Sequence, residues 1–96
     1  MSTSHSAHVE KLKAKLDEWD SHIAKLEAQA RTKQADARIS YDKALADLRE
    51  RRAKAKHKLD AFEHASEGAL DDLKHGFERA LSDMSDAYKR AAARFG

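Results

Sequence analysis

The sequence predicts an all-α protein, a long-helix antiparallel coiled coil or helical hairpin that is oligomeric. More than half of the 96 residues are Ala, Glu, Lys, Leu or Arg, a composition typical of long helices and coiled coils. There is no proline and there are only three glycines, so little in the chain forbids helix. Large apolar residues also recur at alternating spacings of three and four, which is the period of a coiled-coil seam.

The first predicted element is a long heptad helix over residues 7–65, preceded by a disordered tail over residues 1–6. The tail is small, polar and unpatterned, with Ser6 as a plausible helix cap. The seam then runs through Val9, Leu12, Leu16, Trp19, Ile23, Leu26 and Ala30, and it resumes at Tyr41, Leu45, Leu48, Leu59 and Phe62. We interpret the alanine-rich stretch between the two runs as a stutter, a local unwinding of one continuous helix.

The second predicted element is a helix over residues 69–96, separated from the first by a possible turn or kink at residues 66–68. This segment contains a repeat of 11 residues, in which Leu73 and Met84 occupy equivalent positions and Phe77 lies beside them. An 11-residue period keeps a stripe on one face of a nearly straight helix, and we expect that face to pack in a core.

The charge distribution predicts antiparallel pairing about residue 66. Basic side chains predominate in residues 1–59 and 87–96, whereas acidic ones predominate in residues 60–86. A hairpin and an antiparallel homodimer would both bring Asp71, Asp72 and Glu78 alongside the basic residues of the first helix, and both arrangements stay open. In the hairpin the seam from Val9 to Ala30 overhangs, so we expect a second copy to cover it, giving a homodimer or homotetramer.

One basic run could bind anions. It contains Arg49, Arg51, Arg52, Lys54, Lys56 and Lys58. Such a run can contact the phosphates of nucleic acid or of anionic lipid. Pairing with the acidic segment that follows is the favoured interpretation, with an anionic membrane as a possible partner and nucleic acid as an unlikely one.

A metal site and catalysis are also considered. His57, Asp60 and His64 share one helical face and could hold a divalent cation, although a charge-rich solvated face is the favoured interpretation. The absence of cysteine excludes disulfides and thiolate chemistry, and no glycine-rich loop or catalytic triad pattern occurs. We therefore expect neither an enzyme nor a cofactor.

Several segments resemble a family of small bacterial coiled-coil proteins. These are the run from Glu10 to Trp19, the segment Ala35–Arg38 followed by Tyr41, the run Leu48–Arg52, the segment Asp71–Lys74 and the ending Ala93–Phe95. The family is mostly uncharacterised, and some members are labelled stress-response proteins. The resemblance implies a helical coiled coil and attributes no catalytic residue to this chain.

The function predicted from the sequence is that of a non-enzymatic, self-associating scaffold or a stress-associated binding protein. Because no secretion signal or membrane-spanning stretch is visible, we expect it in the cytoplasm. One alternative is an amphipathic helix protein that binds anionic membrane surfaces. Another is nucleic-acid or divalent-metal binding.

Overall fold

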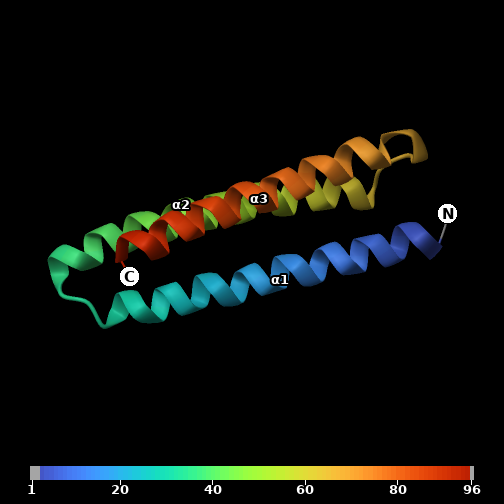
Figure 1. The fold of residues 1–96 in the computed structure, drawn as a ribbon. Helices are drawn as coiled ribbons and strands as arrows, with labels where there is room; N and C mark the ends of the chain where they lie inside the picture. The colour runs from blue at the N-terminus through green and yellow to red at the C-terminus, as the bar shows by residue number, and fades with distance from the viewer. Residues whose placement is uncertain (1–2, 96) are drawn as a thin grey trace.

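The computed structural model describes residues 3–95 as three long helices packed side by side. They are α1 (Thr3–Arg31), α2 (Ala35–Glu63) and α3 (Leu70–Phe95), with a short 3-10 turn, η1 (Glu67–Ala69), before the last. The chain runs up, down and up again, so that α1 and α3 are both antiparallel to α2 (Figure 1). The bundle measures 52 × 17 × 17 Å. The predicted all-α class is confirmed.

The predicted continuous helix over residues 7–65 is wrong, because the chain reverses between α1 and α2. The amide groups of Thr32 and Lys33 bond to the carbonyl oxygens of Gln29 and Ala30 at 3.1 Å each, and these tight turns close the end of α1. No large apolar residue stands between Ala30 and Ile39, so no core contact holds this stretch straight. What we interpreted as a stutter is the first turn of a three-helix bundle.

The predicted tail over residues 1–6 is also wrong where the structure describes it, since α1 begins at Thr3. His5 is 6% exposed. Its Nε2 lies 2.9 Å from the carbonyl oxygen of Phe62, and its ring meets the Phe62 ring edge to face. The first turn of α1 is therefore packed against the end of α2. Residues 1 and 2 of the predicted tail lie outside the described residues.

A second reversal between Glu63 and Leu70 joins α2 to α3. His64 and Ala65 close the end of α2 through backbone bonds to Asp60 and Phe62, and η1 follows. This turn lies at the position predicted from the sequence, residues 66–68.

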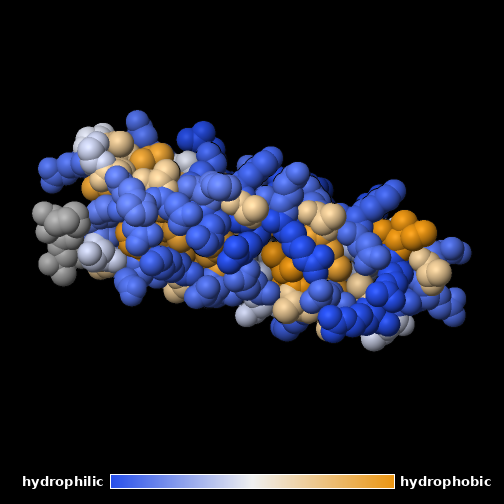
Figure 2. Space-filling view, turned by 180° about the vertical axis from the view of Figure 1, so that it is seen from behind, coloured by the Kyte–Doolittle hydropathy of each residue, from blue (hydrophilic) through white to orange (hydrophobic). Residues whose placement is uncertain are grey.

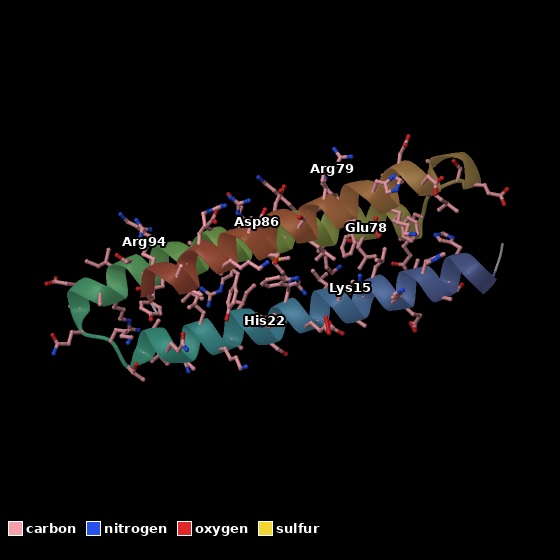
Figure 3. The ribbon with its side chains drawn as sticks, viewed as in Figure 1. Lys15, His22, Glu78, Arg79, Asp86 and Arg94 are labelled. Carbon is pink, nitrogen blue, oxygen red and sulfur yellow. The ribbon has the colours of Figure 1, made fainter. Side chains whose placement is uncertain are left out.

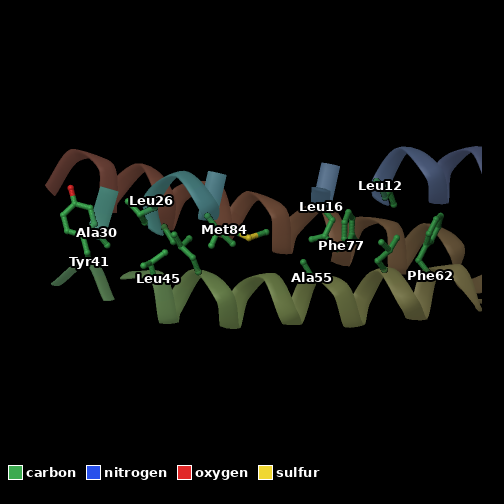
Figure 4. Close-up of a cluster of buried hydrophobic side chains, with 14 of the residues drawn as sticks. Leu12, Leu16, Leu26, Ala30, Tyr41, Leu45, Ala55, Phe62, Phe77 and Met84 are labelled. Atoms are coloured by element: carbon green, nitrogen blue, oxygen red, sulfur yellow. The ribbon is translucent and has the colours of Figure 1, made fainter. Parts of the chain in front are cut away.

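A single core runs the length of the bundle and contains the residues that were predicted to form an oligomer seam (Figure 4). Phe77, Leu48 and Met84 are the largest fully buried side chains. Val9, Leu12, Leu16, Ile23, Leu26, Tyr41, Leu45, Leu59 and Phe62 are buried with them, while Trp19 and Leu73 are partly buried. The Val9 to Ala30 seam, which we expected a second copy to cover, is thus covered by α2 and α3 of the same chain.

The α1/α3 side of the bundle is more open than its other two sides. The backbones of these two helices lie further apart than those of α1 and α2 or of α2 and α3. Aromatic side chains occupy part of the space, with the Trp19 ring 5.5 Å and the His22 ring 5.4 Å from the Tyr88 ring. Trp19 therefore packs at the edge of the core, between α1 and α3, and not at its centre.

The face seen from behind is mainly polar (Figure 2). Ile39, at 57% exposure, is the one large apolar residue in the described chain that is largely exposed. No described helix is long and apolar enough to cross a membrane. The apolar face of the 11-residue repeat lies in the core, where Phe77, Met84, Ala87 and Ala91 are buried.

Candidate anion-binding groove

Four of the six residues in the basic run of α2 are paired with carboxylates. Arg49 donates to Glu27 at 2.6 Å and Arg52 donates to both oxygens of Asp20 at 2.7 and 3.0 Å. Both carboxylates belong to α1. The charge blocks predict that acidic residues of the last helix pair with these two arginines, and that prediction is wrong.

The other two pairs lie within α2. Arg51 donates to Asp47 at 2.9 Å, and Lys56 lies 3.3 Å from Asp60. The predicted neutralisation of the basic run therefore occurs for Arg49, Arg51, Arg52 and Lys56 in the structure, although through other partners than expected.

Lys54 and Lys58 instead line a groove between α2 and α3. We call this surface the α2/α3 groove; it consists of two hollows of about 360 and 590 Å³ that share Asp47. No residue of α1 lines either hollow. The lining residues are Ser40, Lys43, Ala44, Asp47, Glu50, Arg51, Lys54 and Lys58 from α2, and Gly76, Arg79, Ala80, Asp83, Ala87, Arg90, Ala91, Arg94 and Phe95 from α3.

The α2/α3 groove is positively charged. Seven basic side chains line it against three acidic ones, in a chain whose formal net charge is only +2. Of these seven, only Arg51 has a carboxylate of a described residue within 4.0 Å. Figure 3 shows Arg79 and Arg94 on the edge of α3 that faces away from α1. Six cations are therefore left to meet an external anion.

The side chains that line the α2/α3 groove differ in size. Seven are long and basic, whereas Ala44, Gly76, Ala80, Ala87 and Ala91 are small. Small side chains at these positions leave room for a ligand to approach both helices, and the basic chains on either side are long enough to close on it. On the α2 side the lining runs from Ser40 to Lys58, a length of roughly 27 Å at 1.5 Å per residue.

The residues of the possible metal site do not assemble. The Asp60 carboxylate binds Lys56, and the Nδ1 atom of His64 lies 2.9 Å from the main-chain carbonyl oxygen of Asp60 rather than beside its carboxylate. His57 is exposed one turn away. In the described part of the chain no group of three His, Cys, Asp or Glu side chains could hold a metal ion.

No protein-family model, curated protein or solved structure matches this chain. The resemblance to small bacterial coiled-coil proteins therefore stays a prediction.

Four of the seven basic residues of the α2/α3 groove lie outside the basic run predicted from the sequence. Lys54 and Lys58 belonged to the basic run, but Lys43, Arg79, Arg90 and Arg94 stood outside it. A signal for two of them was present, because Arg79 and Arg90 are 11 residues apart and the repeat places such positions on one face of the last helix. Only the packing of α2 on α3 shows that Lys54 and Lys58 lie opposite that face.

Proposed function

We propose that this chain is a non-enzymatic binding protein whose α2/α3 groove holds a flexible chain of phosphates. The observation that carries the proposal is a set of six basic side chains that form no ion pair with any described residue. They come from two helices and lie along one groove. Phosphate chains occur both in single-stranded nucleic acid and in inorganic polyphosphate, and charge alone would attract either.

The shape of the groove favours a flexible chain over a lipid bilayer. A bilayer offers a flat surface, and surface helices hold it by burying an apolar face in it. The apolar faces of all three helices are turned into the core, and Ile39 is the only large apolar side chain that is largely exposed in the described residues. A narrow strand can instead follow the groove and contact the basic side chains that line it.

The lining also favours recognition by charge rather than by sequence. Single-stranded nucleic acids are usually gripped by aromatic rings that stack on the bases. In the α2/α3 groove Phe95 alone could do so, and it already stacks on Tyr41 with ring centroids 4.0 Å apart. Glu50 and Asp83 reduce the positive potential, so affinity should be moderate and strongly dependent on salt.

The test is a titration of labelled oligothymidylate of about 12 nucleotides, within the usual range of about 4–16 for such sites. Inorganic polyphosphate of the same phosphate number serves as competitor. If all six unpaired cations contact phosphates, log affinity should fall with log salt at a slope of about −4, at about 0.7 per contact. A roughly fourfold rise in salt would then weaken binding about 300-fold.

A charge-matched pair of variants locates the site. Lys54→Ala, Lys58→Ala and Arg79→Ala together remove three groove cations, so the slope should drop to about −2. The control removes three exposed lysines of α1 that make no ion pair with a described residue, Lys11, Lys15 and Lys25, and leaves the same net charge. Equal losses in the two triple variants would overturn the groove as the site. Binding to anionic vesicles but to neither phosphate chain would point to a membrane instead.

A further inference from the structure

We infer that α1 can be exchanged between two copies of this chain. In the exchanged dimer the turn at residues 32–34 straightens, α1 and α2 become one long helix, and α1 packs on α2 and α3 of the second copy. This inference goes beyond the proposed phosphate binding, because no residue of α1 lines the α2/α3 groove and each copy keeps its groove intact.

The turn between α1 and α2 has no strong local stop signal. Thr32, Lys33 and Gln34 include neither glycine nor proline, and no described residue has a positive φ. Gln34 begins α2 without a hydrogen bond from its side chain to the helix end, whereas Ser, Thr, Asp or Asn would normally supply one. The helix break therefore depends on the packing of α1 against its own chain, and a second copy offers the same packing.

The apolar faces of α1 and α2 would align in a continuous helix. Ala30 is the last buried residue of α1 and Tyr41 is the first of α2. They are 11 residues apart, which is close to three turns of an α-helix, so a straight helix would place both on one face. The buried stripes of α1 and α2 would then form one continuous stripe. A second copy would be needed to cover it.

The exchanged dimer keeps the contacts of α1 with α2 and α3 and loses contacts at the turn. The Arg52–Asp20 and Arg49–Glu27 pairs, the His5–Phe62 contact and the Trp19–Tyr88 contact would all form again between copies. The losses are local to the turn, namely the 2.7 Å bond from the Thr32 hydroxyl to the Gln29 carbonyl and the position of Lys33 over the Tyr41 ring at 5.7 Å. Straightening adds helical backbone bonds in their place.

Exposure and spacing make α1 the element that moves. Every residue from 31 to 40 is exposed, so nothing packs over the turn and resists its straightening. The backbone of α1 also lies further from α3 than the α2 and α3 backbones lie from each other, so α2 and α3 can stay together as a hairpin. Exchange of a terminal element through a short connection is a general route to dimers.

The test compares two variants with the same charge change at the turn. Lys33→Ala with Gln34→Ala favours the continuous helix. Lys33→Gly with Gln34→Pro disfavours it, because proline in a helix interior removes a backbone hydrogen bond and clashes with the preceding turn. Gln34 accepts proline in the turned form, because its φ is −71°. Each variant is refolded from urea at low and at high protein concentration, and its mass is measured by light scattering.

We expect the Ala pair to give mainly dimer at high concentration and the Gly-Pro pair to stay monomeric. Small-angle scattering should show a dimer about 90 Å long, the length of a helix from Thr3 to Glu63, against 52 Å for the monomer. A monomeric Ala pair at every concentration would overturn the inference. The inference would also be overturned if the Gly-Pro pair formed as much dimer as the Ala pair.

Cross-linking separates exchange from simple surface association. The chain has no cysteine, so one copy can carry Asp20→Cys and another Arg52→Cys without background. These positions face each other across α1 and α2. After mixed refolding, a short bifunctional thiol reagent should join the two copies through these positions in the dimer. A dimer that cannot be joined in this way would contradict the exchange of α1.

Discussion

Gly76 lies within α3 at a place where a methyl group should stabilise the protein. A Cβ atom added there would meet only the Cδ and Nζ atoms of Lys58, both at 4.0 Å, which is ordinary contact with the end of a flexible side chain. Because the φ of Gly76 is not positive, alanine fits the backbone without strain. Glycine costs about 0.8–1.0 kcal/mol relative to alanine in a helix interior. Gly76→Ala should therefore raise the free energy of unfolding by about 1 kcal/mol.

For a domain of this size, a change of about 1 kcal/mol corresponds to a melting temperature about 4–8 °C higher. Thermal unfolding followed by circular dichroism measures it. Ala80→Gly, one turn further along and also half-buried, should lower the melting temperature by a similar amount. The double variant Gly76→Ala with Ala80→Gly keeps the composition and should melt within about 2 °C of the parent. A lower melting temperature for Gly76→Ala alone would mean that α2 and α3 approach more closely here than the structure has them.

Three further substitutions test the core and its ion pairs. Phe77→Ala removes a ring with no exposed surface and should lower the free energy of unfolding by about 3–5 kcal/mol. This is a large part of the roughly 5–14 kcal/mol expected for a chain of this length, and it should be measured as a lower urea midpoint. Trp19→Ala should cost less than Phe77→Ala in the same assay, because Trp19 is only partly buried; a larger loss would refute its position beside Tyr88. Arg52→Ala breaks a partly exposed pair with Asp20 and should cost at most about 1 kcal/mol, falling as salt is added; a loss independent of salt would contradict the ionic explanation.

The helical class and the core could be predicted from the sequence because both follow from local periodicity. A residue such as Leu16 or Met84 is buried in any arrangement that covers its stripe. The period says which face is covered but not what covers it. Covering by a second copy and by a third helix of the same chain both fit the seam from Val9 to Ala30.

The first turn could not be predicted because its residues carry no distinctive chemistry. Thr32, Lys33 and Gln34 are compatible with helix, and the interval from Ala30 to Tyr41 suits a straight helix as well as a turn. The second turn was predicted because Ser66, Glu67 and Gly68 contain both a cap and a helix breaker. The pairing of charges was predicted wrongly for the same reason as the first turn, since a two-helix hairpin leaves Asp20 and Glu27 too far from Arg52 and Arg49.

The groove and the exchangeable helix use different parts of the bundle, and this separation has a physical consequence. Arg49 and Arg52 point to α1 and hold it through carboxylates, whereas Lys54 and Lys58 of the same helix line the opposite groove. A phosphate chain bound between α2 and α3 therefore displaces none of the ion pairs that fix α1. Salt weakens both phosphate binding and the ion pairs of α1. In the α2/α3 groove six cations would contact the ligand together, so its affinity should depend strongly on salt. At α1 each exposed ion pair contributes at most about 1 kcal/mol to the stability of the bundle. Moderate salt should release the ligand while the bundle stays folded.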